Sequence, residues 1–316
     1  MINRTFFLLV LFALVLTTTH ASAQERMRVI LDWFVNPDHA PLIVALERGY
    51  FADEGLQVEL IEPGDPNDPP KLVATGEMDV GVSYQPQLHL HVDKGLPLRS
   101  IATLVATPLN SLVVLADGDI NEIADLRGRK VGYSLAGFED ALLATVLERH
   151  GLSLDDVETV DIHFSIVPAL LSGRVDAVIG AFRNFEPVKL MLEGREGKTF
   201  FLEEEGVPAY DELIVVAHES RAASEQMASF VRALERGVIY LVNHPRESWD
   251  LFAGYRDDLD NELNRLAWDE TLPRFALRPR AVDSARYEAF ARFLEARGLI
   301  EKARPAEAYL APQIMP

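Results

Sequence analysis

The stretch LDWFVNPDHAPLIVALERGYFADEGLQVEL, residues 31–60, decides the fold class. It opens as the end of an apolar, strand-like run that breaks at the NPD triplet, residues 36–38. From His39 onward the apolar residues recur at helical spacing, and Gly49 supplies a helix stop signal. A second strand-like run, LQVELIEP, follows. The order strand, helix, strand predicts a βαβ unit with parallel strands.

Strand and helix patterns continue to alternate to about residue 200, which favours an α/β fold. A second series begins with a strand at 130–133 and a helix at about 138–150. A strand from Glu212 then returns the chain to the first series. We therefore expect two α/β lobes joined by two crossings, with a ligand cleft at the carboxyl ends of the strands. The expected boundaries are residues 24–115 and 212–316 for lobe I and residues 116–211 for lobe II.

The first 23 residues have the composition of a secretory signal peptide. Arg4 precedes an apolar run of eleven residues, and the ASA triplet at 21–23 is a small-residue cleavage pattern. The run is too short to span a bilayer comfortably, with a retained membrane anchor as the alternative. The chain has no cysteine, which a lipid-anchored exported protein needs at its cleavage point. We expect a cleaved signal peptide at 1–23 and a soluble, periplasmic protein.

Composition and motifs argue against several function classes. The formal net charge is −19, whereas nucleic-acid binding needs an excess of Lys and Arg. The absence of cysteine excludes thiol catalysis and iron–sulfur clusters, and the chain has no G-x-S-x-G, P-loop or H-E-x-x-H motif. His89 and His91 stand two apart on a predicted helix, so they do not face the same way as metal ligands would. We expect a protein without catalysis, cofactor or metal.

Aromatic, amide and acidic residues recur where the predicted strands end. The residues expected to face the cleft are Trp33, Asn36, His39, Tyr84, Gln85, Ser134, Phe138, Phe182, Asn184, Glu186 and Tyr210. Aromatic faces can sandwich a flat, neutral-to-basic heteroaromatic ring, while a carboxylate and amides read its nitrogens. A sulfonate or nitrate would instead prefer arginine, and Arg183 is the only strand-end arginine that could serve it.

Two of these interpretations have alternatives. Trp33 could be an ordinary core tryptophan. The segment from Ser134 to Phe138 opens a predicted helix, where free backbone N–H groups can receive a polar ligand group, but it could also be a simple βα turn.

The opening stretch resembles the signature of the periplasmic-binding superfamily that includes the ThiY-like pyrimidine-binding proteins and the thiamine-pyrimidine synthases. GEMDVGVSY, GLPLRSIATL, LRGRKVGY and GRVDAVIGAF continue the match in order, over residues 28–245. The resemblance implies a type II periplasmic-binding-protein fold and a receptor that hands its ligand to an ABC permease. It also implies a thiamine-precursor pyrimidine as ligand, either hydroxymethylpyrimidine or formylaminomethylpyrimidine. Riboflavin, or another small solute such as a sulfonate, is the alternative ligand in the same fold.

The resemblance also assigns residues. Trp33, Asn36 and His39 match the first-lobe signature, and Glu186 is the candidate carboxylate for an aminopyrimidine. The lysine and the histidine of the synthases would fall on Ser83 and Gln87, and their cysteine-rich motif would fall near VPAYDEL, which has no cysteine. These departures favour a transport receptor over an enzyme.

Overall fold

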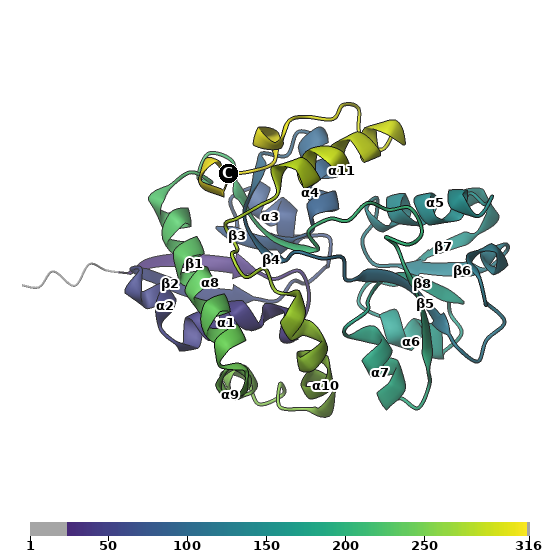
Figure 1. Cartoon of the computed structure of the whole chain (residues 1–316), viewed down its shortest axis with the longest axis horizontal. Helices are drawn as coiled ribbons and strands as arrows, with labels where there is room; N and C mark the ends of the chain where they lie inside the picture. Colours follow the sequence, from purple (N-terminus) through teal and green to yellow (C-terminus); the bar gives the residue numbers. More distant parts are fainter. Residues whose placement is uncertain (1–23, 315–316) are drawn as a thin grey trace, which may run out of the picture.

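The computed structural model describes residues 24–314, so the expected signal peptide at 1–23 lies outside the described residues. The chain forms two α/β lobes side by side, each built on a five-stranded sheet (Figure 1). The strands are β1 (Glu25–Ile30), β2 (Leu56–Ile61), β3 (Val80–Ser83), β4 (Leu98–Val105), β5 (Asn110–Leu115), β6 (Lys130–Tyr133), β7 (Glu158–Asp161), β8 (Ala177–Phe182), β9 (Gly197–Phe201) and β10 (Leu213–His218).

Helices flank both sheets. The α-helices are α1 (Ala40–Glu47), α2 (Tyr50–Asp53), α3 (Pro69–Ala74), α4 (Gln85–Asp93), α5 (Glu139–Arg149), α6 (Ile166–Leu171), α7 (Glu186–Leu192), α8 (Glu225–Asn243), α9 (Pro245–Tyr255), α10 (Glu262–Thr271) and α11 (Ser284–Ala296). Short 3-10 turns are η1 (Pro37–His39), η2 (Ile123–Leu126), η3 (Leu154–Asp156), η4 (Leu272–Arg274), η5 (Ala306–Ala308) and η6 (Pro312–Ile314). The expected βαβ opening is therefore present as β1, α1 and β2, and α1 ends beside Gly49, whose φ of 71° suits a residue without a side chain.

The two sheets share one plan. Their strand orders are β2-β1-β3-β10-β4 and β7-β6-β8-β5-β9. In each sheet three parallel strands are followed by one antiparallel strand, β10 or β5, and then by an edge strand. Parallel strands place their carboxyl ends at one edge, so both lobes can present strand-end side chains to a shared cleft.

One expected boundary is wrong. We expected residues 24–115 in lobe I, but β5 pairs with β8 and β9 of the second sheet. The first crossing therefore lies at residues 106–109, and the second at residues 202–212. We call these two segments the hinge. An apolar run such as SLVVL shows that a strand forms, but it does not show which sheet the strand joins.

The long helix α8 returns the chain to the first lobe and packs across α1. Its buried face includes Phe230, which stacks on Phe51 with ring centroids 5.0 Å apart. At Gly237 a Cβ would lie 2.6 Å from the carbonyl oxygen of Pro41. A glycine is thus needed where the two helices cross, because any side chain would push them apart.

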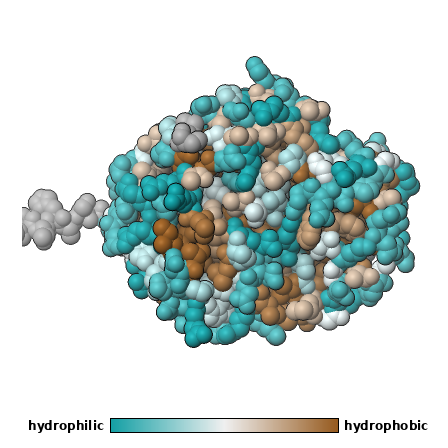
Figure 2. Space-filling view, in the orientation of Figure 1, coloured by the Kyte–Doolittle hydropathy of each residue, from teal (hydrophilic) through white to brown (hydrophobic). Residues whose placement is uncertain are grey.

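The face in Figure 2 is mostly hydrophilic, with a few apolar patches. Within residues 24–314, none of the helices combines the length and apolar composition that a membrane span would need.

Candidate functional site

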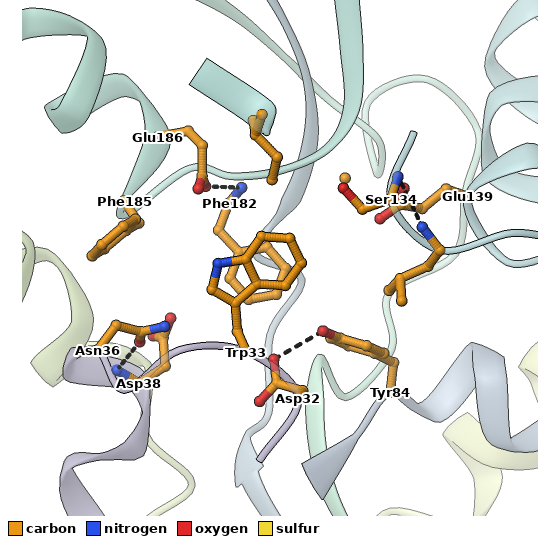
Figure 3. Close-up of a pocket in the computed structure, with 13 residues that line it drawn as sticks. Asp32, Trp33, Asn36, Asp38, Tyr84, Ser134, Glu139, Phe182, Phe185 and Glu186 are labelled. Atoms are coloured by element: carbon orange, nitrogen blue, oxygen red, sulfur yellow. Dashed lines mark hydrogen bonds between the residues drawn. The ribbon is translucent and has the colours of Figure 1, made fainter. Parts of the chain in front are cut away.

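A pocket lies between the lobes, beside the ends of β1, β3, β6 and β8 (Figure 3). The empty space in it, part of which is open solvent, is about 440 Å³. The first lobe contributes Asp32, Trp33, Asn36, Asp38 and Tyr84. The second lobe contributes Ser134, Leu135, Glu139, Ile166, Gly180, Phe182, Phe185 and Glu186. Both lobes therefore supply the walls.

Trp33 lies in the middle of the pocket in Figure 3. Its indole ring is only partly buried and meets the ring of Phe164 from the second lobe edge-on, with centroids 4.6 Å apart. Leu31, two residues earlier, is fully buried in the first lobe. The chain thus passes from the first-lobe core to the pocket between these two residues, and the Trp33 ring also packs against the apolar cluster of the second lobe.

A buried hydrogen-bond network holds the first-lobe wall in place. Asp32 Oδ2 accepts from the Tyr84 hydroxyl at 2.8 Å, and Asp32 Oδ1 lies 2.9 Å from His39 Nε2. The Nδ1 atom of His39 accepts from the backbone N–H of Asn36 at 3.2 Å. A neutral histidine that accepts at Nδ1 carries its proton on Nε2, so His39 donates to Asp32.

His39 therefore does not line the pocket as expected from the sequence. Its side chain is fully buried behind the wall, and both ring nitrogens are used inside the first lobe. It orients Asp32, which lines the pocket instead. Asn36 does line the pocket, with its Oδ1 capping η1 through the N–H of Asp38 at 2.8 Å.

The pocket is acidic. Asp32, Asp38, Glu139 and Glu186 line it, and none of the lining residues, all in the described part of the chain, is Lys or Arg. Burial raises the pKa of Asp38 to about 6, that of Glu186 to about 7 and that of Glu139 to about 8. Such a pocket favours a ligand that donates N–H groups or carries positive charge, and it disfavours an anion.

Several backbone N–H groups of the helix N-terminus at 134–138 are already bonded within the second lobe. Glu139, at the start of α5, accepts the N–H groups of Ser134 at 2.6 Å and Leu135 at 3.1 Å through Oε2. The Ser134 hydroxyl donates to the His163 carbonyl oxygen. Ser134 lines the pocket, but its backbone N–H and that of Leu135 are taken by the Glu139 carboxylate of the same turn.

Phe182, Phe185 and Glu186 form the second-lobe wall as one turn between β8 and α7. Glu186 Oε2 accepts the backbone N–H of Phe182 at 2.6 Å, which fixes the carboxylate beside the aromatic ring (Figure 3). Gly180, at φ 98°, leaves room for the Glu139 side chain, because a Cβ at position 180 would lie 2.1 Å from Glu139 Oε1.

Phe138 and Asn184, also expected in the cleft, lie behind the pocket walls. The Phe138 ring is buried and stacks on Tyr84 with centroids 5.5 Å apart. Asn184 is fully buried and bonds to Asp38 and Thr271 of the first lobe. Both residues connect the lobes, but neither lines the pocket.

Gln85 and Tyr210 are likewise outside the pocket and pack beside the hinge. Gln85 Oε1 accepts from the backbone N–H of Asp211 at 2.8 Å, and both residues are buried. The fully buried Tyr210 ring meets Phe290 of α11 edge-on at 5.4 Å. Hinge residues and pocket residues both lie near strand ends, so the sequence pattern does not distinguish the two groups.

Two neighbouring acids fix the hinge. Asp211 accepts from the Thr103 hydroxyl at 3.0 Å through Oδ2 and pairs with Arg286 through Oδ1, both in the first lobe. Glu212 Oε2 accepts the backbone N–H groups of Leu109 at 2.6 Å and Asn110 at 2.8 Å, where β5 begins. The two crossings are thereby tied to each other.

Seven lining residues are missing from the expected set: Asp32, Asp38, Leu135, Glu139, Ile166, Gly180 and Phe185. Asp32 and Asp38 stand in the opening stretch, and Phe185 follows the same strand as Phe182, so their positions carried a signal. Ile166 belongs to an ordinary apolar helix face, which gives none. Within the described residues no group of three His, Asp or Glu side chains could hold a metal ion.

Comparison with known families identifies the chain. Residues 36–248 match the family described as NMT1/THI5 like. The protein belongs to this family. A relative from Haemophilus influenzae, provisionally named a thiamine biosynthesis protein, is 50% identical over 92% of this chain and 93% of its own. The formylaminopyrimidine-binding protein of Halalkalibacterium halodurans is 36% identical over 81% of this chain and 78% of its own.

Enzymes also occur among the relatives of this NMT1/THI5-like protein. A protein of Legionella pneumophila named 4-amino-5-hydroxymethyl-2-methylpyrimidine phosphate synthase is 29% identical over 81% of this chain and 82% of its own. Among solved structures, the alkanesulfonate-binding protein SsuA from Xanthomonas axonopodis pv. citri bound to MOPS superposes with a TM-score of 0.72 and 16% identity. The superposition covers 92% of this chain and 99% of the SsuA chain.

These likenesses confirm the type II periplasmic-binding-protein fold expected from the sequence. A relative named a binding protein and one named a synthase each match most of the length of this NMT1/THI5-like chain.

Proposed function

We propose that this protein is the periplasmic receptor of an ABC importer and binds a thiamine-precursor pyrimidine, either hydroxymethylpyrimidine or formylaminomethylpyrimidine. The observation that carries the proposal is the pocket between the lobes, where aromatic side chains stand beside carboxylates without a Lys or Arg among the described lining residues. A relative named a formylaminopyrimidine-binding protein supports the same ligand class.

The aromatic walls suit a flat ring. Trp33 of the first lobe would stack on one face of the pyrimidine, and Phe182 or Phe185 of the second lobe would cover the other. Glu186 would accept an N–H of the exocyclic amine, because its carboxylate is held at the pocket wall by the Phe182 backbone. An anionic sulfonate or nitrate would meet several carboxyl groups and no Lys or Arg among the described lining residues, which disfavours those ligands despite the shared fold.

The residues at positions 83 and 87 favour a transport role over synthesis. Ser83 and Gln87 stand where the resemblance places a lysine and a histidine of the synthases. Here they are buried and bond to each other, Ser83 Oγ to Gln87 Oε1 at 2.8 Å. A hydroxyl and an amide closed on each other offer neither the charge nor the base that those positions would need for chemistry.

Binding would act through lobe closure. The pocket takes walls from both lobes, so a ligand makes all its contacts only when the lobes are together and thereby shifts the population toward the closed state. Direct contacts between the lobes include Asn67 Nδ2 to the Ser134 carbonyl oxygen at 3.2 Å and the Trp33–Phe164 ring pair. The closed form would then dock on the permease.

Thermal unfolding of the chain from residue 24 tests the ligand. The panel is hydroxymethylpyrimidine, formylaminomethylpyrimidine, thiamine, riboflavin, taurine and nitrate. A ligand at about 100 times its Kd adds about 2.7 kcal/mol, which corresponds to a rise in Tm of about 4–5 °C for a chain of this size. We expect that rise with a pyrimidine. A rise with riboflavin or taurine alone would overturn the ligand assignment, and chemical conversion of a bound pyrimidine, followed by mass spectrometry, would overturn the transport role.

A further inference from the structure

Asp38 is a pocket acid with one bonded carboxylate oxygen and one buried oxygen that lacks a donor. It lies in η1 with 1% of its surface exposed and lines the pocket. Oδ1 accepts an N–H of Asn184 at 2.8 Å. Oδ2 is buried, and no donor among the described residues reaches it. The carboxylate is thus half satisfied, and Oδ2 is the oxygen left for an occupant of the pocket.

Asn184 makes this carboxylate part of the contact between the lobes. It stands between β8 and α7 of the second lobe, and its Nδ2 donates to Asp38 Oδ1 and to the Thr271 hydroxyl oxygen, both at 2.8 Å. Thr271 is held in turn, because its hydroxyl donates to the Ala267 carbonyl oxygen at 2.7 Å. Both N–H groups of one amide therefore cross from the second lobe to the first. A separation of the two lobes would break both bonds.

A buried carboxylate oxygen without a donor destabilises the unliganded closed state. The neighbouring His39 does not relieve it, since Nε2 donates to Asp32 and Nδ1 accepts from Asn36. Burial raises the pKa of Asp38 to about 6, so the group is mainly ionised at pH 7 and can only accept. A ligand N–H would therefore remove a cost that the empty closed pocket carries.

We propose that Asp38 couples ligand recognition to lobe closure, with Oδ2 accepting an N–H of the ligand while Oδ1 holds Asn184 of the second lobe. The inference rests on the proposed function, namely that a ring with an N–H donor occupies this pocket. It adds a residue absent from the expected contacts and names the ligand group that this residue reads. A heteroaromatic compound of the same size without the amine should fill the pocket and still leave Oδ2 without a donor.

The test compares two compounds on the chain from residue 24. One is 4-amino-5-hydroxymethyl-2-methylpyrimidine, and the other is the same ring without the 4-amino group. Titration calorimetry gives both affinities for wild type, Asp38→Asn, Asp38→Ala, Asn184→Ala and the exposed control Asp269→Asn on α10. X-ray scattering with each compound reports closure, and the melting temperature without ligand shows that each variant is folded.

We expect Asp38→Asn to weaken the amino compound about tenfold and the analogue less than about twofold, with Asp38→Ala showing the larger loss of selectivity. Asn184→Ala should weaken both compounds by one common factor and leave the liganded protein more extended. Asp269→Asn should behave as wild type.

Equal losses for the two compounds in the Asp38 variants, or unchanged closure in Asn184→Ala, would overturn the inference alone. If wild type binds neither compound, the proposed function falls and this inference falls with it.

Discussion

Two buried aspartates, Asp211 at the hinge and Asp38 in the pocket, use their carboxylate oxygens in different ways. At the hinge the Asp211 carboxylate has a first-lobe donor on each oxygen, the Thr103 hydroxyl and the Arg286 guanidinium. In the pocket Asp38 keeps Oδ2 without a donor among the described residues. Asp211 is thus satisfied within the first lobe and helps to fix the shape of the hinge, whereas Asp38 holds an acceptor that an occupant of the pocket can satisfy.

This difference separates stability from binding. Changes at the hinge should lower the free energy of unfolding, and changes in the pocket should lower ligand affinity with little effect on unfolding. The following four experiments test that separation, with the largest expected effect first.

Asp211→Ala should give the largest effect, on unfolding. It leaves the Arg286 guanidinium and the Thr103 hydroxyl without their shared acceptor. Breaking a buried pair costs about 3–5 kcal/mol, and we expect about 3 because the Arg286 side chain is 30% exposed. Urea unfolding measures the change against Asp269→Asn, which removes an exposed acid. A wild-type midpoint in the variant would mean that this network does not stabilise the hinge.

Trp33→Ala should change binding instead. Removing a stacking surface costs about 1–3 kcal/mol, or about 5- to 150-fold in Kd for the pyrimidine. The unliganded variant should melt close to wild type, since the indole is only partly buried. Calorimetry and a melting curve on one sample distinguish the two quantities. A large loss of stability together with normal binding by the folded fraction would make Trp33 a core residue after all.

Glu186→Gln should have a smaller and more selective effect. The variant keeps an acceptor for the Phe182 N–H but loses the charge that strengthens a bond to an aminopyrimidine. We expect about a tenfold weaker Kd for an aminopyrimidine, about 1.4 kcal/mol, and little change for a ring without the amine. Equal affinity of wild type and variant for the aminopyrimidine in calorimetry would remove Glu186 from the contacts.

The smallest effect concerns pH. Burial raises the pKa of Glu139 to about 8 and that of Glu186 and Glu212 to about 7. The folded state then holds protons that the unfolded state has lost, so this stability is present below the unfolded pKa and is lost as pH rises through 7 and 8. Burial lowers the pKa of His89 to about 3 and of His91 to about 4, so both are neutral above pH 7.5.

We therefore expect the unliganded protein to lose about 1 kcal/mol between pH 7.5 and 8.5, mostly through Glu139. Glu139→Gln should flatten this part of the pH profile in urea unfolding. A wild-type slope in that variant would assign the loss to other groups.

The sequence predicted the local elements well, because periodicity and stop signals are local. The strand expected at 130–133 is β6, and the helix expected at about 138–150 is α5, Glu139–Arg149. The sheet joined by β5 was not predictable in the same way, because it depends on pairing with β8 and β9 far along the chain.

The site was predictable in part for the same reason. Trp33, Asn36, Tyr84, Ser134, Phe182 and Glu186 follow strand ends and line the pocket. His39 and Gln85 also follow strand ends, but their hydrogen-bond partners turn them inward. The pattern near a strand end shows that a polar side chain is available there. It does not show whether that side chain already forms a hydrogen bond with a neighbour such as Asp32 or Asp211.

The position of β10 has a consequence for the order in which the chain folds. All five strands of the second sheet come from one continuous segment, residues 110–201. In the first sheet β4 pairs with β10, and its Ser100 also exchanges backbone hydrogen bonds with Tyr309 and Ala311. When the N-terminus of the chain emerges first, the second lobe can therefore fold before β10 and residues 309–311, the two neighbours of β4, are available. The first lobe, which carries Trp33, would then complete its fold last, after almost the whole chain has emerged.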